Sequence, residues 1–407
     1  MILTKDDLKN CINIDLSIFM MNVEQFHQQI EKSGKYILIT QFDGIGDAVC
    51  ISAMIRELHK SYPSHKIIIV CYEAKRTLFE FNPNIYRIIT VEDDITIYED
   101  YIERLIDRIF ELTKLNIEIG IHPQYNEVNL CGNMVLMLSG CKKRIGYSHK
   151  DYERFYHNVV INTGRVDKHN DLLLTDVITP PDHIINMVGR YLYILEYLSL
   201  PIANTKLELF LKQELYVPKP YIIISLGGSV INKRYPFKDL AEILSLFKDK
   251  QYVLIGGNES IEEAEYISSV LPYVINYVGK LSILETASII SKAHLYVGND
   301  TGTSHIAAAF DIPSIITWKE AKDRTPIYTN HLSAYTQFYP WYGVEVKQNW
   351  YEESIENSLK MCKGIQPNKA IKPCDRRLSY SGCDINRQHC IATIDKNEII
   401  EAIRFFI

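Results

Sequence analysis

The sequence has no apolar run that approaches the roughly 20 residues of a membrane-spanning helix, so we expect no segment to cross a bilayer. It also lacks an apolar stretch behind its first residues, because it turns acidic at Asp6 and Asp7, and a secretory signal peptide is therefore not expected. The net charge of −6 provides no general basic field, which argues against nucleic acid as a partner. These absences favour a cytoplasmic protein.

What the chain does contain is typical of a globular protein. Hydrophobic residues make up 47% of its 407 residues and charged residues 23%, which excludes a disordered chain. At roughly 100–200 residues per domain, this length predicts two domains. Nine cysteines in a cytoplasmic chain are not expected to form disulfides, but four of them gather near the C-terminus, at Cys362, Cys374, Cys383 and Cys390.

Short apolar runs alternate with helical patterns in both halves of the chain. Strands are expected at 36–40, 66–70, 87–91 and 117–121 in the first half, and at 221–225, 252–255, 295–297 and 313–317 in the second. Helices are expected at 101–115, 183–199, 237–248, 259–270, 304–310 and 397–406. The alternation predicts an α/β protein with two Rossmann-like, doubly wound domains that face a cleft, with the ligand at the carboxyl ends of the strands.

A linker around Pro218 and Pro220 separates the two halves. We expect the first domain to span 36–200 and the second 201–395, with a C-terminal helix at 396–407. The segment 1–35 precedes the first strand, and its apolar positions predict either extra packed helices or an oligomer contact.

The first strand is followed by the motif Gly44-Ile45-Gly46-Asp47. A dinucleotide fingerprint would need a third glycine where this chain has Val49, so a nicotinamide-dependent dehydrogenase is disfavoured. Two glycines allow a tight turn under a ligand and place Asp47 near the start of a helix. A carboxylate there either caps the helix or acts as a general base on a hydroxyl.

A second motif, Asp300-Thr301-Gly302 with His305, follows a strand and runs into a helix of small residues. The backbone N–H groups at a helix start form a natural site for a pyrophosphate. The alternative is a well-capped structural helix without a ligand.

A third group of turns lies in the second half. Gly227-Gly228-Ser229 ends a strand, and Lys233 follows four residues later, where it either neutralises a phosphate or forms a solvated loop pair with Arg234. Gly257 and Glu259 mark a further turn, from which an acidic side chain can reach a ribose hydroxyl.

Together and in this order, the motifs resemble glycosyltransferase family 9, the ADP-heptose:lipopolysaccharide heptosyltransferases, over nearly all of residues 36–395. The resemblance rests on Gly44-Ile45-Gly46-Asp47, Gly227-Gly228-Ser229, Lys233-Arg234-Tyr235-Pro236, Gly256-Gly257, Gly279-Lys280-Leu281-Ser282 with Glu285, and Asp300-Thr301-Gly302 with His305. It implies the GT-B fold, with an acceptor-side domain at 36–200 and a nucleotide-sugar donor domain at 201–395.

The resemblance also implies an activity. A heptose or a related sugar would move, with inversion and without a catalytic metal, from a nucleoside-diphosphate donor such as ADP-heptose to an envelope glycan or protein. Asp47 would be the catalytic base and Lys233 would neutralise the diphosphate. The implied donor-binding residues are Gly46, Gly227, Gly228, Ser229, Lys233, Gly257, Glu259, Asp300, Thr301, Gly302 and His305. Oligomer formation and peripheral attachment at the inner membrane are left open.

Two features need separate interpretation. The family usually has an aromatic residue and Gly-Pro-Thr where this chain has Trp318-Lys319-Glu320-Ala321, which leaves the identity of the sugar and the base open. The four C-terminal cysteines either hold a structural iron or zinc, as a similar tail does in part of the family, or serve as small apolar residues.

Two other functions stay in view. A sugar-nucleotide 2-epimerase of the same architecture would convert a UDP-sugar without an acceptor. A non-catalytic family member would act only as an assembly partner, which the presence of Asp47, Lys233 and Asp300 disfavours.

Overall fold

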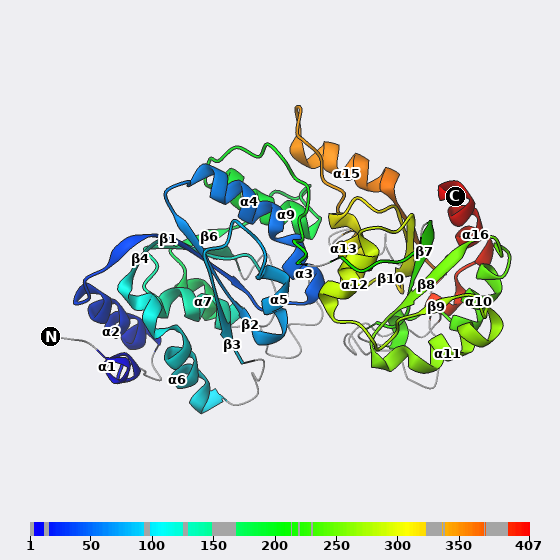
Figure 1. Cartoon of the computed structure of the whole chain (residues 1–407). Helices are drawn as coiled ribbons and strands as arrows, with labels where there is room; N and C mark the ends of the chain where they lie inside the picture. Colours follow the sequence, from blue (N-terminus) through cyan, green and yellow to red (C-terminus); the bar gives the residue numbers. More distant parts are fainter. Residues whose placement is uncertain are drawn as a thin grey trace. The chain divides into compact units, whose positions relative to one another are not determined.

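The computed structural model of the chain describes residues 4–11, 16–92, 98–124, 129–148, 168–212, 214–218, 220–228, 231–322, 336, 338–369, 371 and 390–407. These residues form two compact units (Figure 1). The first unit comprises 1–44, 54–181 and 193–201, and the second comprises 45–53, 182–192 and 202–407. The second unit is therefore built from three separate stretches of the chain.

The first unit contains a parallel six-stranded sheet in the order β3-β2-β1-β4-β5-β6. Its strands are β1 (Ser33–Gln41), β2 (Lys66–Tyr72), β3 (Arg87–Val91), β4 (Leu115–His122), β5 (Lys143–Tyr147) and β6 (Asp176–Ile178). In the centre of the sheet, Ile39 of β1 lies beside Ile69 of β2 and Ile121 of β4. These near-continuous apolar strands reflect a parallel sheet that is covered on both faces.

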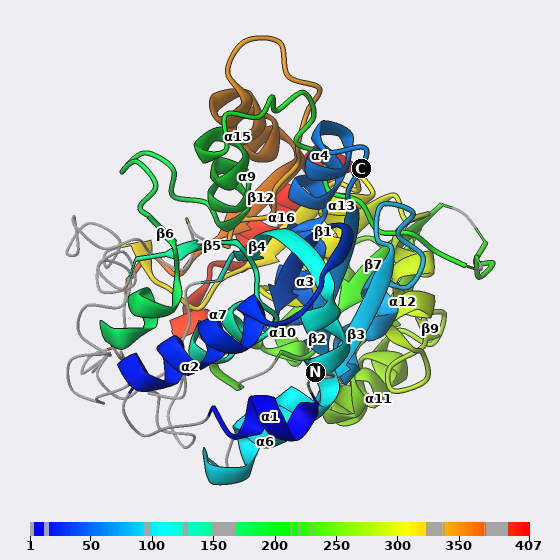
Figure 2. The same cartoon turned by 90° about the vertical axis from the view of Figure 1, so that its left-hand side faces the viewer.

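Helices of the first unit are α1 (Lys5–Lys9), α2 (Leu16–Gln28), most of α4 (Ser52–Ser61), α5 (Arg76–Phe79), α6 (Tyr98–Ile109) and α7 (Asn129–Leu138). Two of them come from the segment before β1, which forms packed helices. Helix α1 lies beside α6 in both views (Figures 1 and 2), and α2 packs against α7. Leu8, Phe19, Val23 and Phe26 are buried there in the core of the unit.

The second unit repeats the plan. Its parallel six-stranded sheet has the order β12-β11-β10-β7-β8-β9. The strands are β7 (Tyr221–Ser225), β8 (Gln251–Ile255), β9 (Ile275–Asn276), β10 (Leu295–Asn299), β11 (Ser314–Thr317) and β12 (Cys362–Ile365). Numbered within each unit, both sheets have the order 3-2-1-4-5-6 of a doubly wound Rossmann fold. The predicted α/β class with two Rossmann-like sheets is confirmed.

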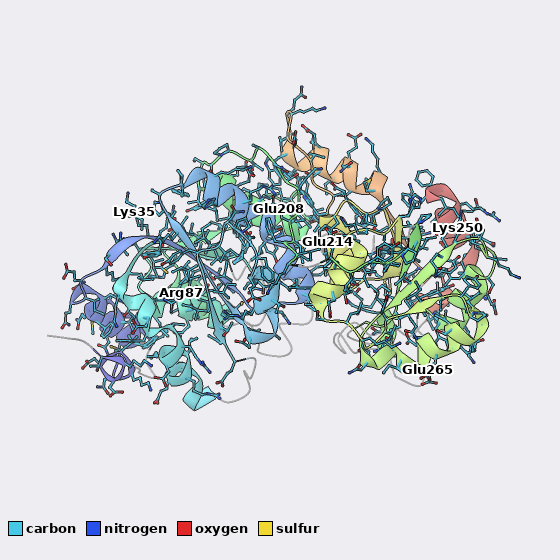
Figure 3. The ribbon with its side chains drawn as sticks, in the orientation of Figure 1. Lys35, Arg87, Glu208, Glu214, Lys250 and Glu265 are labelled. Carbon is cyan, nitrogen blue, oxygen red and sulfur yellow. The ribbon has the colours of Figure 1, made fainter. Side chains whose placement is uncertain are left out.

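Helices of the second unit are α3 (Ile45–Cys50), the larger part of α9 (Met187–Tyr197), α10 (Phe237–Leu244), α11 (Ile261–Val270), α12 (Ile283–Ile290), α13 (Gly302–Ala309), α15 (Trp350–Met361) and α16 (Lys396–Phe406). Residues from α10, α11 and α16 pack on one face of the sheet, with Ile399 and Ile403 of α16 in the core. Charged side chains such as Lys250 and Glu265 lie at the outside of this unit (Figure 3). Among the helices described, none is both long and apolar enough to span a bilayer.

The sheet order determines where a ligand site is expected. In a doubly wound sheet, ligands bind at the carboxyl ends of the strands where the strand order reverses. In the second unit this point lies between β7 and β10. Gly227 and Gly228 follow β7, and Asp300 and Thr301 follow β10, so two of the predicted motifs meet at this point.

Candidate functional site

Two turns meet at the carboxyl ends of β7 and β10. Gly227 and Gly228 have φ angles of +80° and +153°, which side-chain-bearing residues rarely adopt. A Cβ at Gly228 would lie 3.8 Å from Thr301 Cγ2 and 3.5 Å from Lys233 Cβ. The structure therefore places three of the predicted donor-binding positions, Gly228, Lys233 and Thr301, next to one another.

An ion pair joins these turns. Lys233 Nζ donates to Asp300 Oδ2 at 2.7 Å, and the two side chains are only 16% and 10% exposed. A lysine ammonium has three N–H donors, and the bond to Asp300 Oδ2 uses one of them. The pair places an ammonium group in a defined position beside the Gly227-Gly228 turn.

The side chain of Asn299 connects the same turns through hydrogen bonds. This residue is buried at the end of β10, where its amide nitrogen donates to the Gly227 carbonyl at 2.8 Å. Its amide oxygen accepts from the Tyr235 backbone N–H at 3.0 Å and from the Thr317 hydroxyl at 2.8 Å. One side chain thus connects the glycine turn, the loop that carries Lys233, and strand β11.

Arg234 stabilises the Gly227-Gly228 turn through hydrogen bonds. Its Nη2 and Nε donate to the Gly228 carbonyl at 3.1 and 3.3 Å, and its Nη1 donates to the Glu259 carbonyl at 3.2 Å. The Arg234 side chain is 17% exposed and also pairs with Glu263 at 3.6 Å. Burial raises the pKa of Glu263 although Arg234 opposes this effect. Arg234 therefore forms part of the structure of the glycine turn, and the alternative of a solvated loop residue is wrong for it.

Helix α13 begins at the same place. Thr301 is its N-cap residue, and the Thr301 side chain makes no capping hydrogen bond to the helix. The first backbone N–H groups of a helix lack intrahelical partners and carry part of the positive end of the helix dipole. The start of α13 thus adds to the positive field of Lys233 beside the Gly227-Gly228 turn.

Helix α3 packs closely against the start of α13 (Figure 1). A Cβ at Gly302 would lie 2.9 Å from Ile45 Cβ, and one at Gly46 would lie 2.7 Å from His305 Cδ2. Both glycines are thus required by the close approach of the two helices.

His305 is buried against α3, and its Nδ1 lies 3.4 Å from Cys50 Sγ. Burial lowers the pKa of His305 to about 4, which keeps the imidazole neutral near pH 7.

Asp47 lies in the first turn of α3 and belongs to the second unit, together with the turns described above. The Tyr191 hydroxyl of α9 donates to Asp47 Oδ1 at 3.3 Å. The carboxylate is half-buried, so it is held in place by a neighbouring residue and still accessible. This arrangement suits a base that approaches a hydroxyl.

The remaining predicted donor residues lie around the turn after β8. The side chain of Glu259 lies against both Gly257 and Gly227, so these positions belong to the same surface. Ser229 lies outside the described residues. Sequence reasoning missed Asn299 and Thr303, and it left Arg234 open. The available signal was their position, since each stands next to a residue that the motifs had already singled out.

The four cysteines are only partly described. Cys374 and Cys383 lie outside the described residues, so the metal site with them stays a prediction. Cys362 is buried in β12, and burial raises the pKa of its thiol to about 11. Cys390 Sγ accepts from the Ile371 backbone N–H at 3.3 Å. In the part of the chain that the structure describes, no group of three potential ligands is arranged to hold a metal.

This chain is similar in sequence to known proteins. Residues 190–341 match the family model of glycosyltransferase family 9 (heptosyltransferase). Lipopolysaccharide heptosyltransferase 3 of Escherichia coli is 21% identical over 282 residues, which cover 66% of this chain and 79% of that protein. The matched family region contains the Lys233–Asp300 pair, Asn299 and the start of α13.

Solved structures show the same fold. The glycosyl transferase family 9 structure from Veillonella parvula has a TM-score of 0.61 at 18% identity and covers 92% of this chain and 97% of that chain. The Escherichia coli heptosyltransferase WaaC with ADP-2-deoxy-2-fluoro heptose has a TM-score of 0.56 at 18% identity and covers 69% of this chain and 88% of that one. These structures confirm the two-domain GT-B fold, and the match of residues 190–341 to the family model confirms that this chain resembles glycosyltransferase family 9.

Proposed function

We propose that this protein transfers a heptose or a related sugar from a nucleoside-diphosphate sugar such as ADP-heptose to an envelope glycan or protein acceptor, with inversion at the anomeric carbon. The observation that carries the proposal is the Lys233–Asp300 pair beside the Gly227-Gly228 turn and the start of α13. The WaaC structure, whose ligand is an ADP-heptose analogue, supports a donor of this class.

In this proposal the donor diphosphate lies at the junction of the two turns. Lys233, the first N–H groups of α13 and the backbone of the glycine turn supply positive charge and hydrogen-bond donors to it. These groups are in place before the reaction, because Asn299 and Arg234 fix the turns. Preorganised donors stabilise the charge that develops on the leaving diphosphate without further reorganisation.

Asp47 acts as the general base. Its carboxylate takes the proton from the acceptor hydroxyl while that oxygen forms a bond to the anomeric carbon. The bond from the anomeric carbon to the diphosphate oxygen breaks in the same step, and the nucleoside diphosphate leaves with the bonding electrons. A single displacement of this kind inverts the anomeric centre. The Tyr191 hydroxyl keeps the carboxylate oriented for this proton transfer.

The test is a ligand panel followed by product analysis. The melting temperature of the full chain is measured with ADP, GDP, UDP and CDP and with their sugar conjugates, since a ligand at 100 times its Kd stabilises the folded state by about 2.7 kcal/mol. The stabilising sugar nucleotide is then incubated with envelope glycans, and the anomeric configuration of the product is determined by NMR. We expect stabilisation by a nucleoside diphosphate and an inverted product. Conversion of a UDP-sugar without any acceptor would instead identify an epimerase.

A further inference from the structure

Three hydroxyl groups converge on Thr303, the second residue of α13. Thr303 Oγ1 lies 2.7 Å from the Tyr296 phenol oxygen, 2.9 Å from Thr301 Oγ1 and 3.1 Å from Ser225 Oγ. Tyr296 belongs to β10 and is fully buried, whereas Thr301 and Thr303 are partly exposed in the turn above it. A Cβ at Gly298 would come within 3.0 Å of the Tyr296 phenol oxygen, so this strand position leaves room for the hydroxyl.

The proton count restricts how these groups can be arranged. A threonine hydroxyl has one proton and two lone pairs, so Thr303 is fully satisfied when it donates to one of its three neighbours and accepts from the other two. Burial raises the pKa of the Tyr296 phenol, and hydrogen bonds to Ser225, Thr303 and Thr301 oppose this effect, so the phenol keeps its proton and also reaches the other two hydroxyl groups. If Thr303 donates to Thr301, the Thr301 proton is free to point away from the cluster. If Thr303 donates to Tyr296 or Ser225, its contact with Thr301 is a hydrogen bond only when Thr301 donates its proton to Thr303.

The position of Thr301 determines which direction of the hydrogen bonds an anion would favour. Its hydroxyl does not cap α13, and its methyl carbon lies 3.8 Å from the place of a Cβ on Gly228. Lys233 is at the same turn. A Thr301 hydroxyl that donates outward thus adds a hydrogen-bond donor to the proposed diphosphate site, whereas the opposite polarity would present lone pairs to an anion.

We propose that Tyr296, Ser225 and Thr303 are positioning residues that set the direction of a hydroxyl chain, so that Thr301 donates its proton to the diphosphate of the donor. This inference rests on the proposed function and deepens it. Tyr296 and Ser225 donate to Thr303, Thr303 donates to Thr301, and Thr301 donates to a phosphate oxygen. Each bond polarises the next, and no group changes its ionisation state.

The experiment compares nucleoside diphosphate and nucleoside binding by titration calorimetry of the full chain. The probe is the diphosphate that the parent protein binds best among ADP, GDP, UDP and CDP, together with the matching nucleoside. Tyr296→Phe removes the phenol and keeps the ring. We expect its Kd for the diphosphate to rise roughly 3- to 10-fold, as for the loss of one hydrogen bond, with nucleoside binding unchanged.

Tyr342→Phe is the matched control. Tyr342 is also fully buried in the second unit, and its hydroxyl donates to the Ile312 carbonyl at 2.6 Å and lies 2.7 Å from Ser314 Oγ. This variant loses a buried hydroxyl whose hydrogen-bond partners, the Ile312 carbonyl and the Ser314 hydroxyl, are not members of the group around Thr303. We expect a lower melting temperature and an unchanged Kd for the diphosphate.

A second pair of variants tests the hydroxyl chain at Thr303, its central member. Thr303→Val keeps the shape and removes the hydroxyl, and it should weaken diphosphate binding as Tyr296→Phe does. Thr303→Ser restores the hydroxyl and should return the Kd to within about twofold of the parent value, less than the effect of one lost hydrogen bond. A purely steric role would be disturbed more by serine than by valine.

The outcomes separate this inference from the function on which it rests. Equal diphosphate binding by the parent, Tyr296→Phe and Thr303→Val overturns the hydroxyl chain and leaves the donor site intact. Parallel weakening of diphosphate and nucleoside binding also overturns it, because the effect is then structural. A parent protein that binds no nucleoside diphosphate overturns both.

Discussion

Lys233 and Asp300 form a close, largely buried ion pair, with Nζ and Oδ2 2.7 Å apart, although they come from different turns of the second sheet. The pair neutralises the lysine charge while the site holds no anion and keeps the ammonium in a defined place. A lysine that is already oriented loses less conformational freedom when a phosphate arrives. Because both side chains are largely buried, a change of either residue removes the close partner of the other charge.

Lys233→Ala should weaken the binding of the nucleoside diphosphate roughly 10- to 100-fold, as expected for lost charge-assisted hydrogen bonds. Binding of the nucleoside alone should change little, and the effect should shrink at high salt. Adding Asp300→Asn to this variant should restore part of the affinity, because it removes the carboxylate left beside the phosphate. Lys250→Ala is the control, since Lys250 pairs with Asp249 elsewhere in the unit. Diphosphate binding by Lys233→Ala equal to that of the parent would contradict the assignment.

Asp47→Asn should lower the rate of sugar transfer by about 10²- to 10⁴-fold, the usual contribution of a general base. The Kd for the nucleoside diphosphate should stay the same, because the base contacts the acceptor and not the leaving group. Tyr191→Phe removes the hydroxyl that donates to Asp47 and should cost much less. The measurement is single-turnover transfer next to nucleotide titration. Residual activity above about a tenth of the parent rate would rule Asp47 out as the base.

Acid should destabilise the fold through His305. Burial lowers its folded-state pKa from 6.5 to about 4, so between these values the unfolded chain binds more protons than the folded one. The free energy of unfolding therefore falls as the pH falls from about 6.5 to 4, by about 3 kcal/mol for a shift of this size. His305→Gln should flatten this dependence in urea titrations at pH 4.5, 5.5 and 7. His27, whose pKa burial also lowers to about 4, should still contribute in the variant.

Arg234→Lys should not substitute for the arginine. The guanidinium serves the Gly228 and Glu259 carbonyls at once, and an ammonium lacks this planar arrangement of donors. We expect both Arg234→Lys and Arg234→Ala to lower the free energy of unfolding by about 1–3 kcal/mol and to weaken diphosphate binding. Arg404→Lys, at an exposed position of α16, is the control and should leave both quantities unchanged. Full affinity in Arg234→Lys would show that charge alone is sufficient at this position.

The sequence predicted best what depends on local pattern. Runs rich in isoleucine and valine predicted strands at the centre and at one edge of the sheets, so that the predicted strands 221–225 and 87–91 coincide with the central β7 (Tyr221–Ser225) and the edge strand β3 (Arg87–Val91). The strands β5, β6, β9 and β12 were missed, because they have two to five residues and no continuous apolar run. The predicted helix 183–199 begins only at Met187, since the residues before it form turns and caps.

The glycine turns and the Asp300 turn were predicted as parts of one site, because parallel strands end at the same edge of a sheet. The contacts that hold the site could not be predicted in the same way. Cys50 and His305 are 255 positions apart, and their contact depends on how α3 packs against α13. Arg234 and Asn299 act through side-chain directions that periodicity does not reveal. Sequence reasoning therefore singled out positions that meet at the ends of β7 and β10, and the structure added the side chains that support these turns.

The close packing of α3 on α13 has a consequence for how the protein can be divided. The second compact unit includes 45–53 and 182–192, which precede its first strand by many residues. A recombinant fragment that starts at 202 would lack α3 and would expose Gly302 and the buried ring of His305 to water. During synthesis, residues 45–53 and 182–192 leave the ribosome before the strands of the second sheet have been made, so they can pack in the second unit only after those strands have formed. The two halves of the chain are thus not interchangeable modules, and domain exchange with a relative should carry 45–53 and 182–192 along with 202–407.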